Sequence, residues 1–240
     1  FRWPSWPQWR ELPRALTVKE RYGTLGLLVC TFVFGVAWIW MGYVERTDAI
    51  PAQGGAYSEA LVGEPQFINP ILLGINDVDR DIAALVYSGL MKYDTQGNIV
   101  PDLAERYEVS QDGKEYTFFL RNDAEWHSGE KVTVDDVLFT FSAILDSDYG
   151  SPQRASLQGI KVEKIDDQAV KLILPRPYSQ FLERMTIGIV PKHVWENINP
   201  KNINLAEANV MPIGSGPYRF SKFTKDKYGS IASFSLTAHS

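Results

Sequence analysis

The spacing of hydrophobic positions changes along this chain, and each kind of spacing predicts a different element. The stretch from Gly23 to Tyr43 has 21 residues without a charge. As a helix with a rise of 1.5 Å per residue it would reach about 31 Å, enough to cross the hydrocarbon core of a bilayer. The aromatic-rich run from Tyr116 to Leu120 predicts a strand. Helical spacing follows Thr133, where one face is expected to bury Val137, Leu138, Phe141, Ile144 and Leu145.

The start of the helix after Thr133 is well marked. Thr133 can cap it, because Asp136 follows three residues later in a variant of the capping box. Asp135 and Asp136 also lie where the helix dipole favours negative charge. A second helix is predicted from Asp79 to Leu90, and its buried side is expected to hold Ile82, Leu85, Val86 and Leu90.

Short strands and turns surround these helices. Turns are expected at residues 95–98 and 111–114, and Asp166-Asp167-Gln168 should join the two strands of a hairpin. We expect strands at residues 57–62, 160–165, 169–174 and 231–237. Short helices are expected after Pro177 and at Pro191, and residues 197–210 should be a loop. The pattern predicts an antiparallel sheet packed with helices, a mixed α/β (α+β) fold.

The apolar stretch from Gly23 to Tyr43 is longer than the core of an ordinary cleaved signal peptide, and no Ala-x-Ala site closes it. Positive charges precede it, whereas only Arg46 lies near its other end. By the positive-inside rule, residues 1–22 form a cytoplasmic tail and everything after about Val44 lies outside. We therefore expect an uncleaved transmembrane signal anchor at residues 23–43 and a flexible linker at residues 44–56. The positive charges of the N-terminal flank include Arg10, Arg14, Lys19 and Arg21.

Composition narrows the classes of partner. The chain has 240 residues and a net charge of −5. Residues 1–46 carry six Lys/Arg and three Asp/Glu, a balance of +3, so the remainder carries −8. An acidic outer part argues against a nucleic-acid partner, because binding to phosphate needs a basic face.

Candidate chemistry is sparse. Cys30 is the only cysteine, and the three histidines have no ligand spacing. Asp77, Asp79 and Asp81 lack the glycine and terminal glutamate of a calcium-binding loop, and Asp79 and Asp81 are better explained as helix-start residues. No grouping suggests a nucleophile or a nucleotide loop. We expect no catalytic residue, metal site or cofactor.

Several motifs occur in an order that resembles one protein family. Residues 116–146 read strand, Leu-Arg, a short acidic link, an aromatic, His-Ser-Gly-Glu, Asp-Asp-Val and an aromatic helix. Before them come Glu-Pro-Gln with Asn-Pro and the run Val-Pro-Asp-Leu-Ala-Glu, and after them comes Gly-Ser-Gly-Pro-Tyr at 214–218. This order resembles the bacterial extracellular solute-binding proteins of family 5, the oligopeptide- and dipeptide-binding group of ABC importers. The resemblance covers roughly residues 57–240.

The resemblance implies a fold, a function and partners. It implies that residues 57–240 form the first lobe of a two-lobed periplasmic-binding-protein type II fold, preceded here by one transmembrane helix. It further implies a substrate-binding component that is not an enzyme, captures di- or oligopeptides outside the cell membrane and delivers them to permease subunits with their ATPases. The bilayer would be contacted through the stretch from Gly23 to Tyr43. A tethered sensor, or a binder of a nickel complex or a sugar, stays open.

The resemblance also places candidate ligand contacts. In the family, the backbone after the first Asn-Pro loop runs beside the bound peptide, which corresponds to Gly74, Ile75 and Asn76. One oligopeptide-binding member has a peptide-contacting tyrosine after Ser-Pro, where this chain has Gln153. Gly214 and Ser215 belong to a motif whose small residues suit close backbone approach near the cleft. The chain begins with Phe1 and stops in mid-pattern, so we expect a fragment that holds half of a cleft.

Overall fold

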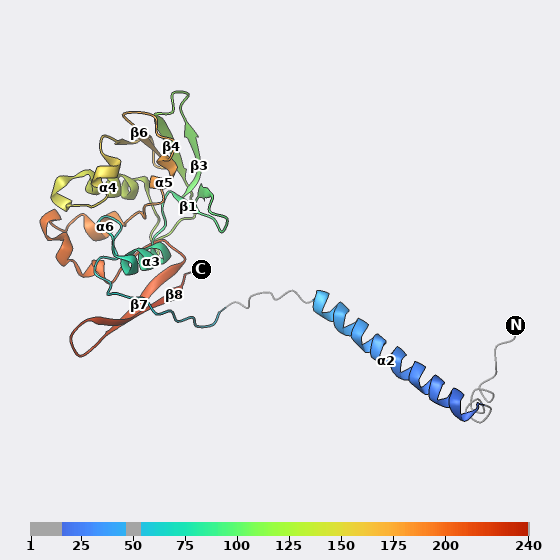
Figure 1. Ribbon diagram of the computed structural model, residues 1–240. Coiled ribbons are helices and arrows are strands. Elements are labelled where there is room, and N and C mark those ends of the chain that lie inside the picture. Colours follow the sequence, from blue (N-terminus) through green and yellow to red (C-terminus); the bar gives the residue numbers. More distant parts are fainter. Residues whose placement is uncertain (1–15, 47–53, 240) are drawn as a thin grey trace. The chain divides into compact units, whose positions relative to one another are not determined.

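The computed structural model describes residues 16–46 and 54–239, in two units that divide between Glu59 and Ala60 (Figure 1). Helix α2, Val18–Arg46, forms the regular part of the first unit. Thr17 caps it, donating its backbone N–H and its hydroxyl to the Glu20 carboxylate at 2.8 and 2.7 Å. The helix is long and apolar enough to cross a membrane over residues 18–42. The predicted tail and linker lie largely outside the described residues.

A four-stranded antiparallel sheet forms one layer of the second unit. Its strand order is β3-β4-β6-β5, with β3 at Ala104–Val109, β4 at Glu115–Leu120, β5 at Lys161–Lys164 and β6 at Ala169–Ile173. Strand β4 alternates half-buried and buried positions, which places Tyr116, Phe118 and Leu120 in the core. The predicted turns at 95–98 and 111–114 and the predicted hairpin at Asp166-Asp167-Gln168 are confirmed.

Helix α4, Val134–Leu145, packs against β5 and β6. Its N-terminus has the predicted capping box: the Asp136 carboxylate accepts hydrogen bonds from the Thr133 N–H and hydroxyl, both at 2.8 Å. Val137, Phe141 and Ile144 are buried as expected, whereas Leu138 and Leu145 lie half-buried at the edge of the core. The prediction of this helix is confirmed.

Helix α3 is shorter than predicted, because it runs over Asp77–Val86 rather than from Asp79 to Leu90. Asn76 is its N-cap and accepts from the Val78 N–H at 3.1 Å. The placement of Leu85 on the buried side is wrong, since its side chain is 42% exposed. Leu90 is buried, but it lies beyond the helix.

Two further expectations are wrong. Residues 57–62 form no strand; Tyr57 and Val62 are exposed, and no described strand pairs with them. An extended run without a partner gains no ladder of hydrogen bonds. Residues 197–210 are not a plain loop, because they form two 3-10 helices, η3 (Pro200–Leu205) and η4 (Glu207–Asn209), that bury Ile203 and Asn209.

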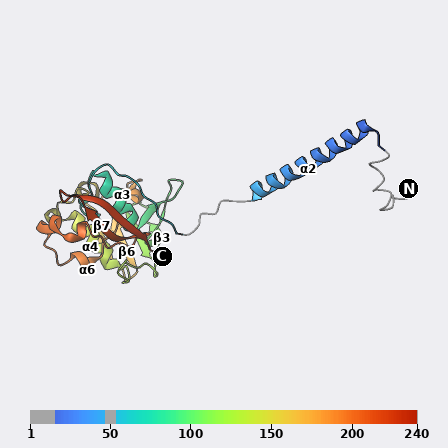
Figure 2. The same cartoon turned by 90° about the horizontal axis from the view of Figure 1, so that it is seen from below.

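The remaining elements complete the unit. The predicted strand near the C-terminus is confirmed as β8, and its partner β7 was not predicted. Figures 1 and 2 show β7 and β8 as a long hairpin at the surface of the unit, beside α3. These elements are β1 (Met91–Tyr93), β2 (Ile99–Pro101), η1 (Ser147–Tyr149), η2 (Arg154–Leu157), α5 (Phe181–Arg184), α6 (Lys192–Trp195), β7 (Tyr218–Lys225) and β8 (Ile231–Ala238).

Candidate ligand-binding pocket

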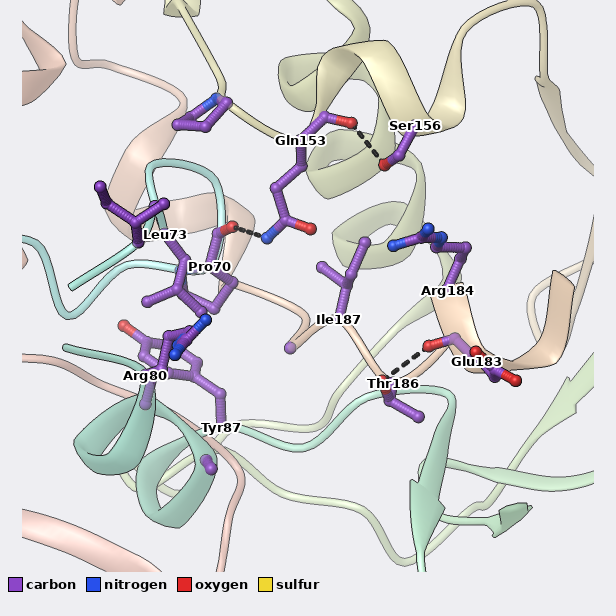
Figure 3. Close-up of a pocket in the computed structure, with 16 residues that line it drawn as sticks. Pro70, Leu73, Arg80, Tyr87, Gln153, Ser156, Glu183, Arg184, Thr186 and Ile187 are labelled. Carbon is purple, nitrogen blue, oxygen red and sulfur yellow. Dashed lines mark hydrogen bonds between the residues drawn. The ribbon is translucent and has the colours of Figure 1, made fainter. Parts of the chain in front are cut away.

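A pocket of about 550 Å³ opens on the second unit where four segments meet. These segments are the loop after Asn69, helix α3, the loop around η2 and the chain that follows α5. Figure 3 shows Tyr87 and Arg80 on one side, Gln153 and Ser156 on another, and Ile187 between them. Its lining residues are Pro70, Leu73, Gly74, Ile75, Arg80, Ala83, Ala84, Tyr87, Pro152, Gln153, Ser156, Glu183, Arg184, Thr186, Ile187 and Gly188.

The loop after Asn69 is held in place by buried amide side chains. The Asn69 side chain accepts from the Ile71 N–H at 3.0 Å and donates to the Asn209 side chain at 3.1 Å. Asn209 is itself buried, and its side chain donates to the Ile203 carbonyl at 2.7 Å. Because these groups satisfy one another away from water, the loop has a fixed conformation. The backbone at Gly74 and Ile75 is therefore presented by a rigid support.

Gln153 connects two walls of the pocket. Its side-chain nitrogen donates to the Pro70 carbonyl at 3.0 Å, as Figure 3 shows, while its own carbonyl accepts from the Ser156 hydroxyl at 2.7 Å. The side-chain oxygen of Gln153 has no hydrogen bond to another described residue and remains an acceptor for a ligand. Gly74 lies across from Pro152, and a Cβ added there would sit 3.9 Å from the proline ring, an ordinary contact.

The floor of the pocket is made by two chain segments about a hundred residues apart. Gly89 and Gly188 form an antiparallel bridge, and the Ile189 N–H donates to the Ser88 carbonyl at 2.9 Å. A Cβ on Gly188 would come within 2.7 Å of the Tyr87 Cβ, so this crossing requires glycine. The Tyr87 hydroxyl is buried without a partner among the described protein atoms. Burial raises the pKa of this hydroxyl, so it stays a hydrogen-bond donor.

Charge is confined to three lining residues. Arg80 pairs with Asp77 on its own helix. Glu183 and Arg184 are exposed, and neither forms an ion pair with a residue in the described part of the chain. The rest of the lining is apolar side chains, backbone and neutral polar groups. Such a surface can bind a ligand through its main chain and tolerate varied side chains, and it offers no nucleophile paired with a base.

The structure brings three of the six predicted contacts into this pocket and places three elsewhere. Gly74, Ile75 and Gln153 line it. Asn76 does not; its side chain caps α3 and donates to the Glu64 carbonyl at 2.9 Å. Gly214 and Ser215 pack against the C-terminal end of α3, where a Cβ on Gly214 would lie 1.9 Å from the Val86 carbonyl oxygen. Close backbone approach is therefore present at Gly214, outside the pocket lining.

His127 holds this glycine motif. Its Nδ1 accepts from the Gly214 N–H at 3.2 Å, its Nε2 lies 2.9 Å from the Gly216 carbonyl, and its own N–H donates to the Gly214 carbonyl at 2.8 Å. These partners specify a neutral ring with the proton on Nε2. Desolvation by burial lowers the pKa of His127, and the nearby His239 and Arg219 lower it further. The ring is a structural clamp, with no free nitrogen for a ligand.

Sequence reasoning missed Tyr87, Arg184 and Ile187. Tyr87 lay inside a predicted helix, Arg184 lay in a predicted short helix, and Ile187 followed that helix; neither Arg184 nor Ile187 has a motif of its own. The bridge between Gly89 and Gly188 and the backbone hydrogen bonds beside it bring these segments together. No local pattern marks such a bridge.

Comparison with known proteins identifies the family. The model of the bacterial extracellular solute-binding proteins, family 5 Middle, matches residues 98–234, which is more than half of the chain. The chain belongs to this family. Family 5 proteins bind solutes and are not enzymes, in agreement with the sequence prediction.

Individual family 5 relatives match over most of this chain. The oligopeptide-binding protein AppA of Bacillus subtilis is 32% identical over 188 residues, covering 77% of this chain and 34% of AppA. The structure of AppA with a nonapeptide has a TM-score of 0.64 at 30% identity, over 68% of this chain and 33% of that one. NikZ of Campylobacter jejuni with Ni(L-His) has a TM-score of 0.62 at 37% identity, over 68% and 32%. The chain thus spans about a third of these relatives, and the mixed α/β fold predicted from the sequence is confirmed.

Proposed function

We propose that this chain is the first lobe of a membrane-anchored, substrate-binding component of an ABC importer that captures di- or oligopeptides outside the membrane and delivers them to permease subunits. The observation that carries the proposal is the pocket at Gly74, Ile75 and Gln153, in a chain that belongs to family 5. All three residues were predicted from the family resemblance, and they come from two different loops that meet along one surface.

The character of the pocket supports a peptide ligand. A peptide can be held along an exposed main chain by backbone hydrogen bonds, a mode that leaves its side chains free to vary. The segment at Gly74 and Ile75 is held rigidly by Asn69, and the Gln153 side-chain oxygen adds an acceptor beside it.

The anchor is proposed from helix α2. Its apolar residues face outward over residues 18–42, and none of this window is buried. Positive charge precedes the span, so the N-terminus is placed in the cytoplasm and the second unit outside. Protease protection of an N-terminal tag in inverted and right-side-out vesicles tests this topology.

A second solute class is favoured by one comparison. NikZ, which was solved with Ni(L-His), is as similar in fold to this chain as AppA is. The described residues contain no cluster of three or more His, Cys, Asp or Glu side chains that could hold a metal ion. A metal–amino-acid complex would therefore have to be bound through its organic part or by residues outside the described part. A tethered sensor is the third reading, and co-purification with permease subunits would argue against it.

Native mass spectrometry tests the proposal directly. The protein would be expressed from Tyr57 through the downstream coding sequence to its stop codon. Ligands that co-purify with it would then be released in the spectrometer, and their masses would be measured. A ladder of masses spaced like amino-acid residues supports a peptide binder. A single non-peptide mass contradicts the peptide part of the proposal, and an empty protein contradicts solute capture.

The 240-residue chain alone should bind peptides weakly. It spans about a third of its relatives, so we expect the pocket to be one wall of a cleft whose other wall lies in a second lobe. In titration calorimetry, peptide mixtures should give a dissociation constant above the micromolar range. Micromolar or tighter binding by this chain would show that one lobe suffices.

A further inference from the structure

The hairpin of β7 and β8 has two unlike faces. Strand pairing places Phe220 opposite Leu236 and Phe223 opposite Phe234. The rings of Phe220 and Phe234 lie 5.1 Å apart, and Phe234 and Leu236 pack against the hydrophobic core. Because paired residues project to the same side of a ladder, these four side chains form the face that is turned towards the unit.

The opposite face is cationic and rich in hydroxyl groups. Arg219 is opposite Thr237, and Lys222 is opposite Ser235. Both cations are exposed, and the Arg219 Nε donates to the Thr237 hydroxyl at 3.2 Å. Strand β8 contains no charged residue at all, so it places no carboxylate beside these cations.

The tip of the hairpin continues the positive charge and adds an exposed aromatic ring. Lys227 lies with its Nζ 4.9 Å from the centre of the Tyr228 ring, and Tyr228 is 79% exposed. The one acidic residue there is engaged in the turn, since the Asp226 carboxylate accepts from the Tyr228 and Ser230 N–H groups at 2.7 and 3.1 Å. Glu64, beside the tip, accepts from the Ile231 N–H at 3.0 Å.

None of the hairpin cations is neutralised by an ion pair with a residue in the ranges 16–46 and 54–239. The fourth cation, Lys225, is exposed at the tip end of β7, where its Nζ lies 5.7 Å from the centre of the Phe223 ring. We call these four cations, together with Tyr228, the cationic hairpin surface: Arg219, Lys222, Lys225, Lys227 and Tyr228. Residues 217–239 contain four Lys/Arg and one Asp, a balance of +3. Since residues 47–240 carry −8, the rest of that part carries −11. One positive surface on an acidic body gives the molecule a strong preference for how it meets a charged partner.

We propose that the cationic hairpin surface docks onto anionic lipid headgroups of the membrane in which α2 is anchored. The inference rests on the anchoring part of the proposed function, which keeps the second unit near a bilayer. Lysines beside an exposed tyrosine suit the headgroup layer, where the ring occupies the interface and each ammonium group meets lipid phosphate.

The test places a probe at the tip of the hairpin in the full chain. In a Cys30→Ser, Ser230→Cys background, a fluorophore on the new cysteine is followed in nanodiscs whose headgroups carry a nitroxide quencher. We expect strong quenching with phosphatidylglycerol present and weak quenching in pure phosphatidylcholine. A change of Lys222, Lys225 and Lys227 to Gln should lower the ratio of docked to free tip about a hundredfold, at about fivefold per cation. Salt at 1 M should have a similar effect, because the Debye length falls to about 3 Å.

A matched control changes the same charge elsewhere. Lys114, Lys161 and Lys201 are exposed and form no ion pair with a described residue, so their change to Gln should leave the quenching intact. Equal loss in both triple variants would overturn the proposal. So would equal quenching in the two lipids, or none in either, the result expected if the partner is an acidic protein.

Failure of the anchor is distinguished separately. Protease protection reports whether α2 crosses the bilayer, independently of the probe at residue 230. If α2 does not insert, vesicles of the same two compositions are added to the chain in solution. Phosphatidylglycerol-dependent quenching then still supports the hairpin surface, and its absence refutes it.

Discussion

Helices α3 and α4 both carry a buried aspartate at the third position of the first turn, but the two carboxylates bind different parts of the chain. In α4, Asp136 accepts from Thr133 at its own N-cap and also from the Lys192 N–H at 2.7 Å. In α3, Asp79 makes no such local bond and accepts instead from the Gln66 and Phe67 N–H groups at 2.7 and 3.1 Å. Asp136 therefore caps its own helix and also binds the start of α6. Asp79 binds a segment more than ten residues away in the chain.

The difference lies in the N-cap residues. Thr133 offers a hydroxyl and an N–H to the carboxylate, so the reciprocal box forms. Asn76 caps α3 through its own side-chain oxygen and directs its nitrogen to Glu64. The Asp79 carboxylate is therefore available to accept hydrogen bonds from the backbone N–H groups of the segment that leads into the pocket loop. The same helix position can therefore serve local stability or the support of a site.

The largest effect on the free energy of unfolding is expected at the C-terminal end of α3, where Gly214 packs closely against the helix backbone. Gly214→Ala would place a Cβ 1.9 Å from the Val86 carbonyl oxygen, backbone against which no side chain can yield. We expect a loss of about 3 kcal/mol or more in the free energy of unfolding, measured by urea denaturation in detergent. Gly74→Ala is the control, since its Cβ meets only ordinary contacts, and it should unfold like the parent chain. Similar midpoints for both variants would contradict the close approach.

The two aspartates come next. Asp136→Ala removes bonds to Thr133 and Lys192 and should cost about 3 kcal/mol, whereas Asp79→Ala removes two bonds and should cost about 2 kcal/mol. Hydrogen exchange sharpens the comparison. Asp79→Ala should deprotect the amides of Gln66 and Phe67, and Asp136→Ala should deprotect Lys192. Deprotection confined to the variant's own helix would refute the long-range role.

A smaller effect is expected from the N-caps. Thr133→Ala should cost about 1 kcal/mol. Because Thr133 and Asp136 share one box, the double variant should lose less than the two single losses combined. Asn76→Ala with Asp79→Ala provides the contrast: their partners differ, so these losses should be nearly additive. Additivity in the first pair would indicate that its reciprocal box contributes nothing.

The smallest effect is a pH dependence specific to the α3 end. Because burial lowers the pKa of His127 in the folded state, the unfolded chain binds the proton first as pH falls below about 6.5. The contribution of His127 to the free energy of unfolding is therefore fully present above that pH, and it is lost as the pH falls through the pKa of the folded state. His127→Gln should flatten this part of the profile relative to the parent chain. An unchanged slope would assign the dependence to other groups.

Local chemistry explains what the sequence predicted well. The capping box at Thr133 and the turn at Asp166-Asp167-Gln168 involve residues within a few positions of one another, so their patterns are readable in one stretch. The strand expected at residues 57–62 failed because a strand also needs a partner, and an apolar run does not name one. Strand β7 was missed because a bulge between Phe220 and Lys222 disturbs its alternation.

The candidate site was only partly predictable for the same reason. Gly74, Ile75 and Gln153 came from the family resemblance, and the structure brings them to one pocket. Tyr87 and Arg184 come together there because of a bridge between Gly89 and Gly188. No sequence pattern in either segment predicts this bridge. The placement of Gly214 and Ser215 near ligand stays a prediction; what the structure shows is their packing on α3.

The loop that carries Gly74 also has a consequence for the order in which the protein is made. Its anchor is Asn209: the Ile68 N–H donates to the Asn209 carbonyl at 2.8 Å, and the two amide side chains meet 140 positions apart in the chain. A ribosome adds about 5–20 residues per second, so Ile68 emerges on the order of ten seconds before its partner. During that interval the pocket wall lacks the partner that fixes its conformation, so this wall forms only after residue 209 has been synthesised.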